Sequence, residues 1–389
     1  MVPRPFWMRR LEESWRQAPI VWLSGVRRSG KTTLAKDLGG KRTLYVNCDL
    51  PQVEDMLSDP VLFYRGCGKE IVVFDEIHRL RDPSRLLKIG ADEFPGLKIL
   101  ATGSSTLAAG KKFKDSLTGR KRQVHLLPIL WNEFPAFGGA SLRKRLFLGG
   151  LPGALLSESK SASFYREWAD SFFSRDIQKL FAFRSYEKFN LLFEYLMKQS
   201  GGLLETAKVA GALGISRPTI SDHLRAMEIT HAVTVVRPFH GGGRRELVKM
   251  PKIYGFDTGF VSFFKGWDPL RPEDCGILWE HFVLEWMQAL RPDSRICYWR
   301  DSSGREVDFV IGDGRGKAHA VECKWDPRSF DPAGLAVFRG FYPAGSNFLV
   351  CPSIPHSYKK RCKGLEVMVC DPAGLARHEE MLGAVGEKR

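Results

Sequence analysis

The stretch GVRRSGKTT at residues 25–33 decides the fold of the first part of this chain. It follows the apolar run at residues 20–23, so we expect a strand before it and a helix after it. This is the G-x-x-x-x-G-K-[ST] phosphate loop, whose glycines let consecutive N–H groups point at phosphate oxygens. Lys31 is expected to reach the β and γ phosphates, and Thr32 to offer its hydroxyl to Mg²⁺. The predicted nucleotide-binding residues are Gly25, Arg28, Ser29, Gly30, Lys31, Thr32 and Thr33.

A second run, IVVFDEIHRL at residues 71–80, ends its apolar part in two carboxylates. A strand that ends in Asp75 places this carboxylate beside the phosphate loop, where it holds Mg²⁺ through water. Glu76 is then placed to polarise the attacking water. The run KILATGSS at residues 98–105 predicts a neighbouring strand with a polar tip. Ser104 or Ser105 in this tip would sense the γ-phosphate, and an ordinary strand-to-turn cap is the alternative.

Arginines are expected to complete the site if subunits form a ring, because a neighbour's guanidinium then stabilises charge in the transition state. Arg120 and Arg175 are the candidates, although either could be a plain surface residue. Arg27 and Arg28, inside the loop, are expected to point to solvent or to a neighbour. The predicted catalytic residues are Lys31, Asp75, Glu76, Ser104 and Arg120.

Length and charge set the broad class of protein. A chain of 389 residues with 43% hydrophobic and 26% charged residues predicts two to four folded domains. The net charge of +15 favours a polyanionic partner, nucleic acid before an anionic membrane, although a basic protein with no such partner remains the alternative. The eight cysteines form no C-x-x-C pair, which argues against zinc and suits a reducing cytosol. No window of 18 apolar residues exists, so a cytoplasmic location is expected.

The pattern along the chain changes after residue 128. Before it, continuous apolar runs at 20–26, 42–48, 71–75, 98–103 and 123–128 alternate with helical segments, as in a parallel sheet covered on both faces. Helices are expected over 131–230, a hairpin after them, a linker at 266–276, and a second α/β unit that starts with a helix at Ile277. The predicted domains are 1–135, 136–200, 201–265 and 270–375.

Residues 203–228 have the pattern of a helix-turn-helix. The first helix ends at Gly214, Ser216 caps the second, and Ile220 and Leu224 form its buried stripe. A β-hairpin wing is expected next, with a glycine turn at 241–243. Contact with DNA and contact with protein alone both remain open for this unit. Its expected exposed residues are Arg217, Thr219, Ser221 and Arg225 on the helix, and Arg244 and Arg245 at the wing tip.

The C-terminal half carries a nuclease-like set of residues. Asp308 lies in a strand pattern, and Glu322 and Lys324 alternate on the next strand, so both point to one face. Glu280, in the preceding helix, can complete the site. Such a group can hold a divalent metal and activate a water for attack on a phosphodiester. The alternatives are a solvated strand face, or a nuclease fold kept for DNA binding without cleavage.

These motifs together resemble the bacterial and archaeal predicted AAA+ ATPases that join a P-loop module to a C-terminal domain of the PD-(D/E)xK nuclease superfamily. The resemblance covers nearly the whole chain. It implies an α/β P-loop AAA+ (ASCE) parallel sheet, a helical and winged-helix middle, and a nuclease-like α/β end. It also implies that ATP and Mg²⁺ bind at the loop. The residues that carry it lie at 25–33, 72–80, 101–107, 116–134, 149–155, 174–177, 249–260, 277–283, 298–311 and 320–324.

Three functions follow from these observations. The first is an ATP-driven motor that remodels branched or forked DNA as a ring of identical subunits. The second is an ATP-regulated, Mg²⁺-dependent DNA nuclease. The third is a nucleotide-gated switch that recruits a protein partner.

Overall fold

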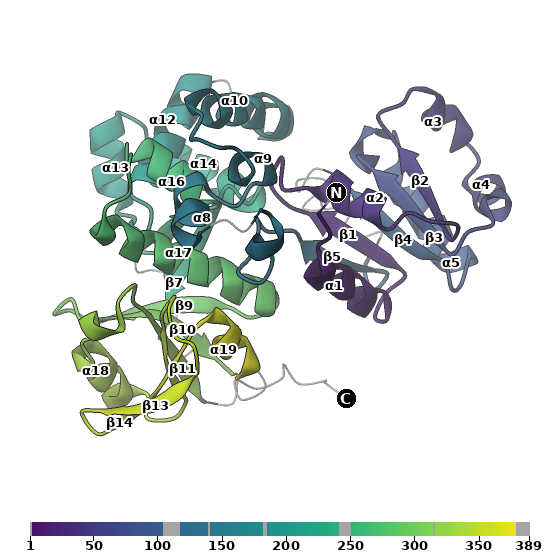
Figure 1. Ribbon diagram of the computed structural model, residues 1–389. Helices are drawn as coiled ribbons and strands as arrows, with labels where there is room; N and C mark the ends of the chain where they lie inside the picture. Colours follow the sequence, from purple (N-terminus) through teal and green to yellow (C-terminus); the bar gives the residue numbers. More distant parts are fainter. Residues whose placement is uncertain are drawn as a thin grey trace.

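Two β-sheets organise the chain in its computed structural model, which describes residues 2–103, 117–138, 141–181, 185–240, 250–313 and 316–378. Figure 1 shows the first sheet on the right, a group of helices at the upper left and the second sheet below those helices. Within the described residues, no helix is long and apolar enough to span a membrane.

The first sheet has five parallel strands in the order β2-β3-β4-β1-β5. This confirms the α/β class and the parallel sheet predicted from the continuous apolar runs. β4 lies between the strand that precedes the phosphate loop, β1, and the strand that ends in Asp75, β3. The elements of this part are α1 (Pro5–Trp15), β1 (Ile20–Ser24), α2 (Lys31–Asp37), β2 (Thr43–Asn47), α3 (Gln52–Met56), α4 (Pro60–Cys67), β3 (Ile71–Asp75), α5 (Pro83–Glu93), β4 (Lys98–Thr102) and β5 (Lys121–His125).

Alternate residues of the central strand β1 enter two different cores, as expected for a sheet covered on both faces. Val21 and Leu23 pack in the core that includes α1 and α2, whereas Ile20 and Trp22 pack in the core that includes α4 and α5. The strand predicted over 123–128 lies earlier in the chain, because β5 begins at Lys121 and ends at His125. As an edge strand that pairs only with β1, β5 can carry polar residues that hide it from an apolar pattern.

The middle of the chain is helical, as predicted. α13 ends before Gly214, and Ser216 accepts a hydrogen bond from the Thr219 N–H at the start of α14. Ile220 is buried and Leu224 is half-buried. The elements are α8 (Leu142–Leu148), α9 (Pro152–Leu155), α10 (Ala162–Phe172), the π-helical turn Phe173–Ile177, α11 (Gln178–Phe181), α12 (Tyr186–Lys198), β6 (Gly202–Leu203), α13 (Thr206–Leu213), α14 (Arg217–Ile229), β7 (Val233–Pro238), β8 (Lys252–Gly255) and α16 (Thr258–Phe264).

The second sheet is mixed and has nine strands in the order β13-β14-β12-β11-β10-β9-β7-β8-β6. The hairpin of β7 and β8 therefore joins the C-terminal strands in one sheet, through a parallel contact between β7 and β9. The remaining elements are α17 (Pro272–Leu290), β9 (Ile296–Arg300), β10 (Glu306–Gly312), β11 (Ala318–Cys323), α18 (Ala333–Phe341), β12 (Asn347–Val350), β13 (Tyr358–Cys362), β14 (Leu365–Cys370) and α19 (Pro372–Arg377).

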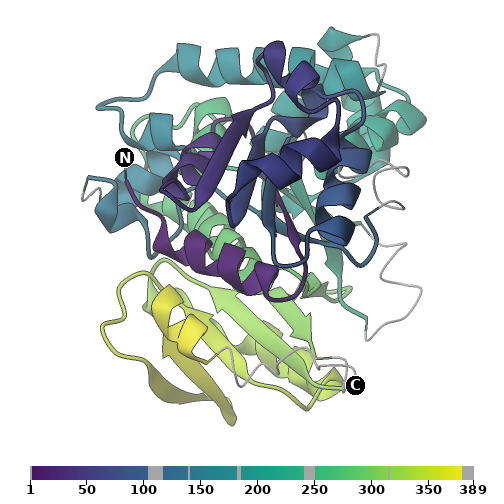
Figure 2. The ribbon, with the colours of Figure 1, turned by 90° about the vertical axis from the view of Figure 1, so that its right-hand side faces the viewer.

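The predicted linker at 266–276 was partly wrong, because α17 begins at Pro272 and not at Ile277. Proline suits the first turn of a helix, where its missing N–H costs nothing. The Asp274 carboxylate accepts the Arg271 N–H, which fixes this start. Figure 2 shows α1 (purple) close to the C-terminal part of the molecule, and Arg10 of α1 donates to the carbonyls of Ala289 and Leu290 at the end of α17.

Candidate nucleotide site and carboxylate cluster

The phosphate loop is held between the end of β1 and the start of α2. Gly25 has φ 150°, and a Cβ there would lie 2.6 Å from the carbonyl oxygen of Leu126. Gly30, the N-cap of α2, has a left-handed φ of 98°. Glycine tolerates both the close approach at position 25 and the positive φ at position 30. The backbone geometry therefore explains why the motif has glycine at these two positions.

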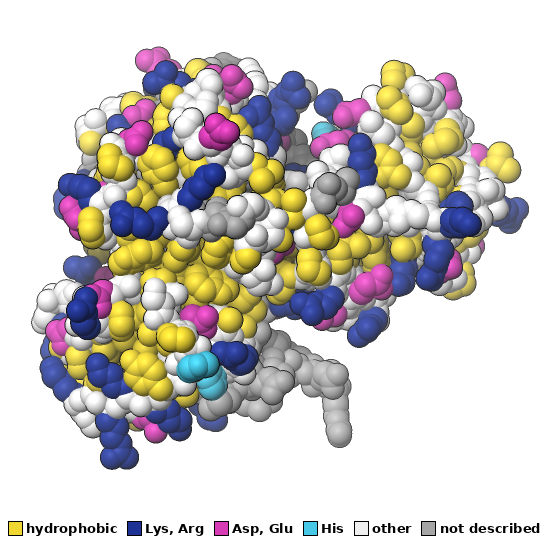
Figure 3. Space-filling model, viewed as in Figure 1, with side chains coloured by type: hydrophobic (Ala, Val, Ile, Leu, Met, Phe, Trp, Pro, Cys, Tyr) yellow, Lys and Arg dark blue, Asp and Glu magenta, His cyan; other side chains and the backbone are white. Residues whose placement is uncertain are grey.

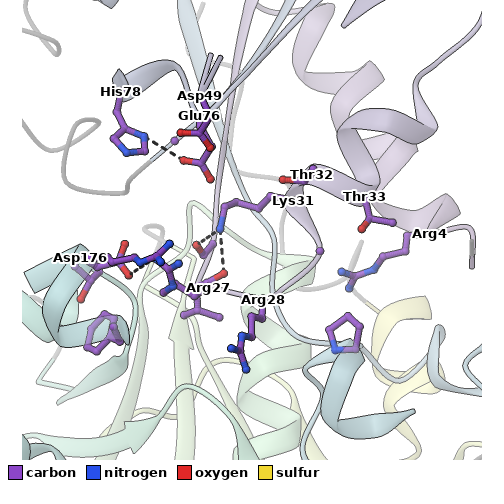
Figure 4. Close-up of a pocket in the computed structure, with 18 of the residues that line it drawn as sticks. Arg4, Arg27, Arg28, Lys31, Thr32, Thr33, Asp49, Glu76, His78 and Asp176 are labelled. Carbon is purple, nitrogen blue, oxygen red and sulfur yellow. Dashed lines mark hydrogen bonds and ion pairs between the residues drawn. The ribbon is translucent and has the colours of Figure 1, made fainter. Parts of the chain in front are cut away.

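Lys31 turns back into this loop, as Figure 4 shows. Its ammonium group donates to the carbonyls of Gly25, at 2.8 Å, and Val26, at 3.0 Å. Burial lowers the pKa of Lys31, and the negative charges of Glu76 and Asp176 oppose that effect. The Lys31 ammonium group thus lies inside the loop, where phosphate oxygens could replace the two carbonyls as its acceptors.

Asp75 lies at the end of β3, buried and held by two hydroxyl groups. Tyr45 donates to it at 2.6 Å, and Thr102 at the end of β4 donates to its other oxygen. Thr102 also accepts the backbone N–H of Glu76 at 3.0 Å. The polar end of β4 therefore holds the Asp75 carboxylate and the backbone of Glu76. The sensor positions predicted at Ser104 and Ser105 lie outside the described residues.

Glu76 faces the pocket from a left-handed backbone position, φ 57°. Its carboxylate lies 3.1 Å from Nδ1 of His78. This hydrogen bond lowers the pKa of the Glu76 carboxyl, although burial opposes it. Glu76 is therefore ionised near neutral pH and can accept a proton from water.

The cavity at the loop has a volume of about 1030 Å³, which suits a nucleoside triphosphate. Ser29 adds a buried hydroxyl with no hydrogen-bond partner among the described residues. Together with the glycine cradle and Lys31, this donor set fits the phosphates of ATP. Thr32 and Asp75 would hold Mg²⁺, which neutralises phosphate charge when it is bound. Charged side chains that line the cavity are Arg4, Arg27, Arg28, Lys31, Asp49, Glu76, Arg79, Arg175 and Asp176.

The cavity lies between the first sheet and the helical part. Figure 3 shows a notch between these two parts with Lys and Arg side chains on both sides. The expectation that Arg27 points to solvent or to a neighbour was wrong, because its guanidinium pairs with Asp176 at 3.3 Å. Arg28 is exposed, and its guanidinium lies 5.3 Å from the ring centre of Phe164. Trp168 of α10 also donates its indole N–H to the carbonyl of Arg27.

Arg4 fixes the loop from the other side, and the sequence patterns did not identify it. Its guanidinium donates to the carbonyls of Ser29, at 3.0 Å, and Leu127, at 3.1 Å. It also donates to both carboxylate oxygens of Glu133 at 2.8 Å. A lone arginine before the first strand carries no motif, so no sequence signal could have marked it.

The two arginine candidates lie at different places. Arg175 is exposed and lines the cavity of its own chain. Arg120 precedes β5 at the opposite end of the parallel strands, where it pairs with Asp92. Its place allows no contact with the loop of its own chain, and the role of either residue in a neighbouring subunit stays a prediction.

Two half-buried histidines connect the cavity to the end of α14. His125 of β5 and His231 have ring centres 3.7 Å apart. Burial lowers the pKa of both, for His231 to about 4, so both are neutral. Thr230, beside His231, lines the nucleotide cavity. The C-terminal end of α14 thus reaches the cavity at the loop, which no pattern along the chain predicted.

The four predicted nuclease-like residues do come together. Lys324 lies 3.1 Å from the Asp308 carboxylate and 3.0 Å from that of Glu322. Burial, and then the charge of Asp308, raise the pKa of Glu322 to about 8. Glu280 of α17 faces the same group, and Asp308 adds to the increase in pKa that burial causes at Glu280.

Three further residues belong to this cluster. Lys252 and Tyr254 of β8 both donate to Glu280, and Lys252 also pairs with Glu306. The i, i+2 spacing of Glu306 with Asp308 could have marked Glu306. Lys252 and Tyr254 lie on a strand that only the fold brings to the cluster. Across the described ranges, no three His, Cys, Asp or Glu side chains are grouped as ligands of a metal ion. In this arrangement the ammonium groups of Lys252 and Lys324 lie against the carboxylates.

Three family models match successive parts of the chain. Residues 17–135 match the family model of an AAA domain. Residues 139–271 and 275–363 match two domains of unknown function, DUF8612 and DUF4143. Similar curated proteins include uncharacterized proteins of Mycobacterium tuberculosis and Mycobacterium bovis, each 28% identical over 326 residues, which is 81% of this chain and 72% of the relative.

Two solved structures with some likeness to this chain have low sequence identity and low TM-scores. The Holliday junction branch migration motor RuvB of Thermotoga maritima is 15% identical, with a TM-score of 0.32 over 65% of this chain and 92% of that chain. A DNA replication initiation factor is 16% identical, with a TM-score of 0.25 over 54% of this chain and 68% of that chain. The family model places an AAA domain at residues 17–135, and the two domains that follow it have descriptions that name no function.

Proposed function

We propose that this protein hydrolyses ATP in the cavity at the phosphate loop and uses the reaction to remodel branched or forked DNA. The observation that carries the proposal is a cavity with a phosphate cradle, a loop lysine and two strand-end acids, lined also by the helical part. Lys31 would bind the β and γ phosphates, and Glu76 would take the proton of the attacking water.

Coupling between hydrolysis and movement would use the contacts that the helical part makes with the loop. Arg27 is held by the Asp176 carboxylate and by the indole of Trp168. A change in loop geometry on phosphate release would alter both contacts. Because α10 and the π-helical turn after it carry these two partners, they would shift relative to the first sheet.

DNA contact is assigned to the unit formed by α13, α14 and the β7–β8 hairpin, read as a winged helix. Arg217, Ser221 and Arg225 are exposed on α14, while Thr219 is half-buried against its cap. The wing-tip residues Arg244 and Arg245 lie outside the described residues. Cations on such a unit would bind phosphates, and the net charge of +15 supports that preference.

A ring of identical subunits would complete the site, with Arg175 or Arg120 of one subunit acting on its neighbour's nucleotide. Exposure of Arg175 beside the cavity favours a place near an interface. Measurement of mass in the presence of an ATP analogue tests this assembly for the natural chain and for Arg175→Ala and Arg120→Ala. ATPase assays of the two variants then show which of them loses turnover.

ATPase and DNA-binding assays test the main proposal. We expect turnover to rise with forked or four-way DNA, and Lys31→Ala to abolish it. Lys41→Ala, an exposed lysine beyond α2 and outside the cavity, is the matched control and should keep wild-type turnover. If Z phosphates are neutralised, the log–log slope of affinity against salt should be about −0.9Z. Turnover independent of DNA, with no DNA binding at low salt, would remove the proposal.

An ATP-regulated, Mg²⁺-dependent nuclease is the second candidate, supported by the convergence of Glu280, Asp308, Glu322 and Lys324. Incubation of linear and branched DNA with Mg²⁺ or Mn²⁺ tests it. Cleavage that is lost in Asp308→Ala but kept in Glu76→Gln would favour it. A nucleotide-gated switch would instead show very slow turnover, a monomeric mass and capture of one protein partner.

A further inference from the structure

The carboxylate cluster of the C-terminal part is built from pairs of residues two apart on three strands. Lys252 and Tyr254 lie on β8, Glu306 and Asp308 lie on β10, and Glu322 on β11 is followed by Lys324. Residues two apart on a strand point to the same face, so each strand contributes two functional side chains to one layer. Glu280 faces this layer from α17.

Lys252 is the innermost cation of this layer. Only 5% of its side chain is exposed, and its ammonium group contacts Glu280 at 3.2 Å and Glu306 more closely. Burial alone would lower its pKa, but the charges of Glu280 and Glu306 raise it above its ordinary value. Lys252 is therefore a buried, charged ammonium group that two carboxylates hold in place.

The carboxylates of the cluster also accept from other donors. Tyr254 donates to Glu280, and Arg300 lies 2.9 Å from Glu306. Lys324 bridges Asp308 and Glu322, and the backbone N–H of Cys323 donates to Asp308 at 2.8 Å. Every carboxylate in the layer thus has at least one cationic partner.

We propose that Lys252 is the resident cation of this cluster and that strand β8 thereby keeps the cluster closed to divalent metal ions. A divalent ion would have to approach carboxylates that already hold an ammonium group, and repulsion between the two cations would oppose its binding. Strand β8 belongs to the hairpin that follows the helix pair α13–α14, so this hairpin supplies the cation to the cluster. The inference rests on the second candidate function, the nuclease, in one respect: that candidate names a divalent metal ion as the ion that is excluded.

Binding of Mn²⁺ to the nucleotide-free, full-length protein, measured by electron paramagnetic resonance, tests this inference. Wild type and Asp308→Asn should bind Mn²⁺ equally weakly. Lys252→Met should bind one additional Mn²⁺ with an affinity at least about 100-fold higher than wild type, because a unit positive charge next to the ion has gone. This gain should disappear in Lys252→Met/Asp308→Asn. Lys359→Met removes an exposed lysine that pairs with Glu366 and should behave as wild type.

Two results would overturn the inference. One is Mn²⁺ binding by the wild type that is lost in Asp308→Asn, since the cluster would then be open as it stands. The other is a folded Lys252→Met that binds no more Mn²⁺ than wild type. If Lys252→Met does not fold, Lys252→Met/Glu306→Gln removes one charge of each sign and serves in its place. Comparison of wild type with Asp308→Asn can overturn the inference without either variant. DNA cleavage is scored separately, so Mn²⁺ binding without cleavage supports the inference and removes the nuclease candidate.

Discussion

Replacement of Arg4 by methionine tests whether the N-terminal segment holds the phosphate loop in shape. The Arg4 and Glu133 side chains are 5% and 2% exposed, and removal of one partner from such a buried ion pair costs about 3–5 kcal/mol. Glu133 would keep two donors, the Trp7 indole at 3.2 Å and the Leu130 N–H at 3.1 Å. We therefore expect Arg4→Met to lower the free energy of unfolding by about 3 kcal/mol, near the low end of that range.

A double-mutant cycle separates the energy of the Arg4–Glu133 ion pair from that of the other contacts of these two side chains. Glu133→Gln removes the charge but keeps an oxygen for the Trp7 and Leu130 donors. In Arg4→Met/Glu133→Gln the buried charge is gone, so the loss should fall below the sum of the single losses by about 1–3 kcal/mol. Urea denaturation followed by tryptophan fluorescence measures these differences. Arg9→Met replaces an exposed arginine of α1, the helix that begins after Arg4, and should stay within about 0.5 kcal/mol of wild type.

The same variant makes a functional prediction. Arg4 donates to the carbonyl of Ser29, so Arg4→Met should loosen the loop and raise the KM for ATP more than it lowers kcat. Arg4→Lys keeps the charge but not the forked geometry, so its KM for ATP should lie between those of wild type and Arg4→Met. Single losses below about 1 kcal/mol that simply add in the double variant, together with an unchanged KM, would refute the reasoning.

Three further changes have defined outcomes. Gly25→Ala places a methyl group 2.6 Å from the carbonyl oxygen of Leu126, so calorimetry with ATP should show no binding; wild-type affinity would contradict the cradle geometry. Trp168→Phe removes the donor to the Arg27 carbonyl and should cost about 1 kcal/mol of stability, with a KM for ATP raised several-fold in steady-state assays; a change in neither quantity would show that the contact does not matter. Burial lowers the pKa of His281 to about 3, below its ordinary value of 6.5, so the folded state binds fewer protons than the unfolded state and stability falls as the pH falls below 6.5. Between pH 6.5 and 5 this amounts to about 2 kcal/mol, which His281→Gln should not show in denaturation curves; identical pH profiles would contradict the assignment.

Much of the nucleotide site was predictable because its residues lie next to one another in the chain. A glycine turn after a buried strand, and a carboxylate at the end of another, are local features that a parallel sheet brings to one edge. Lys31 and Glu76 line one cavity, and Asp75 lies at the end of β3, next to Glu76 in the chain. Their catalytic roles stay predictions. Arg27 was misplaced because its partner, Asp176, lies far along the chain in the helical part.

The cluster in the C-terminal part shows the same limit. Asp308, Glu322 and Lys324 could be grouped from their alternation on neighbouring strands. Lys252 could not be assigned to them, because its strand joins the second sheet only through the pairing of β7 with β9.

By itself, the sequence determined the α/β class, the phosphate loop and the helical middle, since apolar periodicity, glycine spacing and capping residues act over a few neighbouring residues. The tertiary structure alone decided that Arg4 and Trp168 hold the loop, that His231 lies against His125, and that Lys252 neutralises the carboxylates. The physical reason is that a buried charge or donor needs a partner within hydrogen-bond distance, and only the folded chain determines which distant residue supplies it.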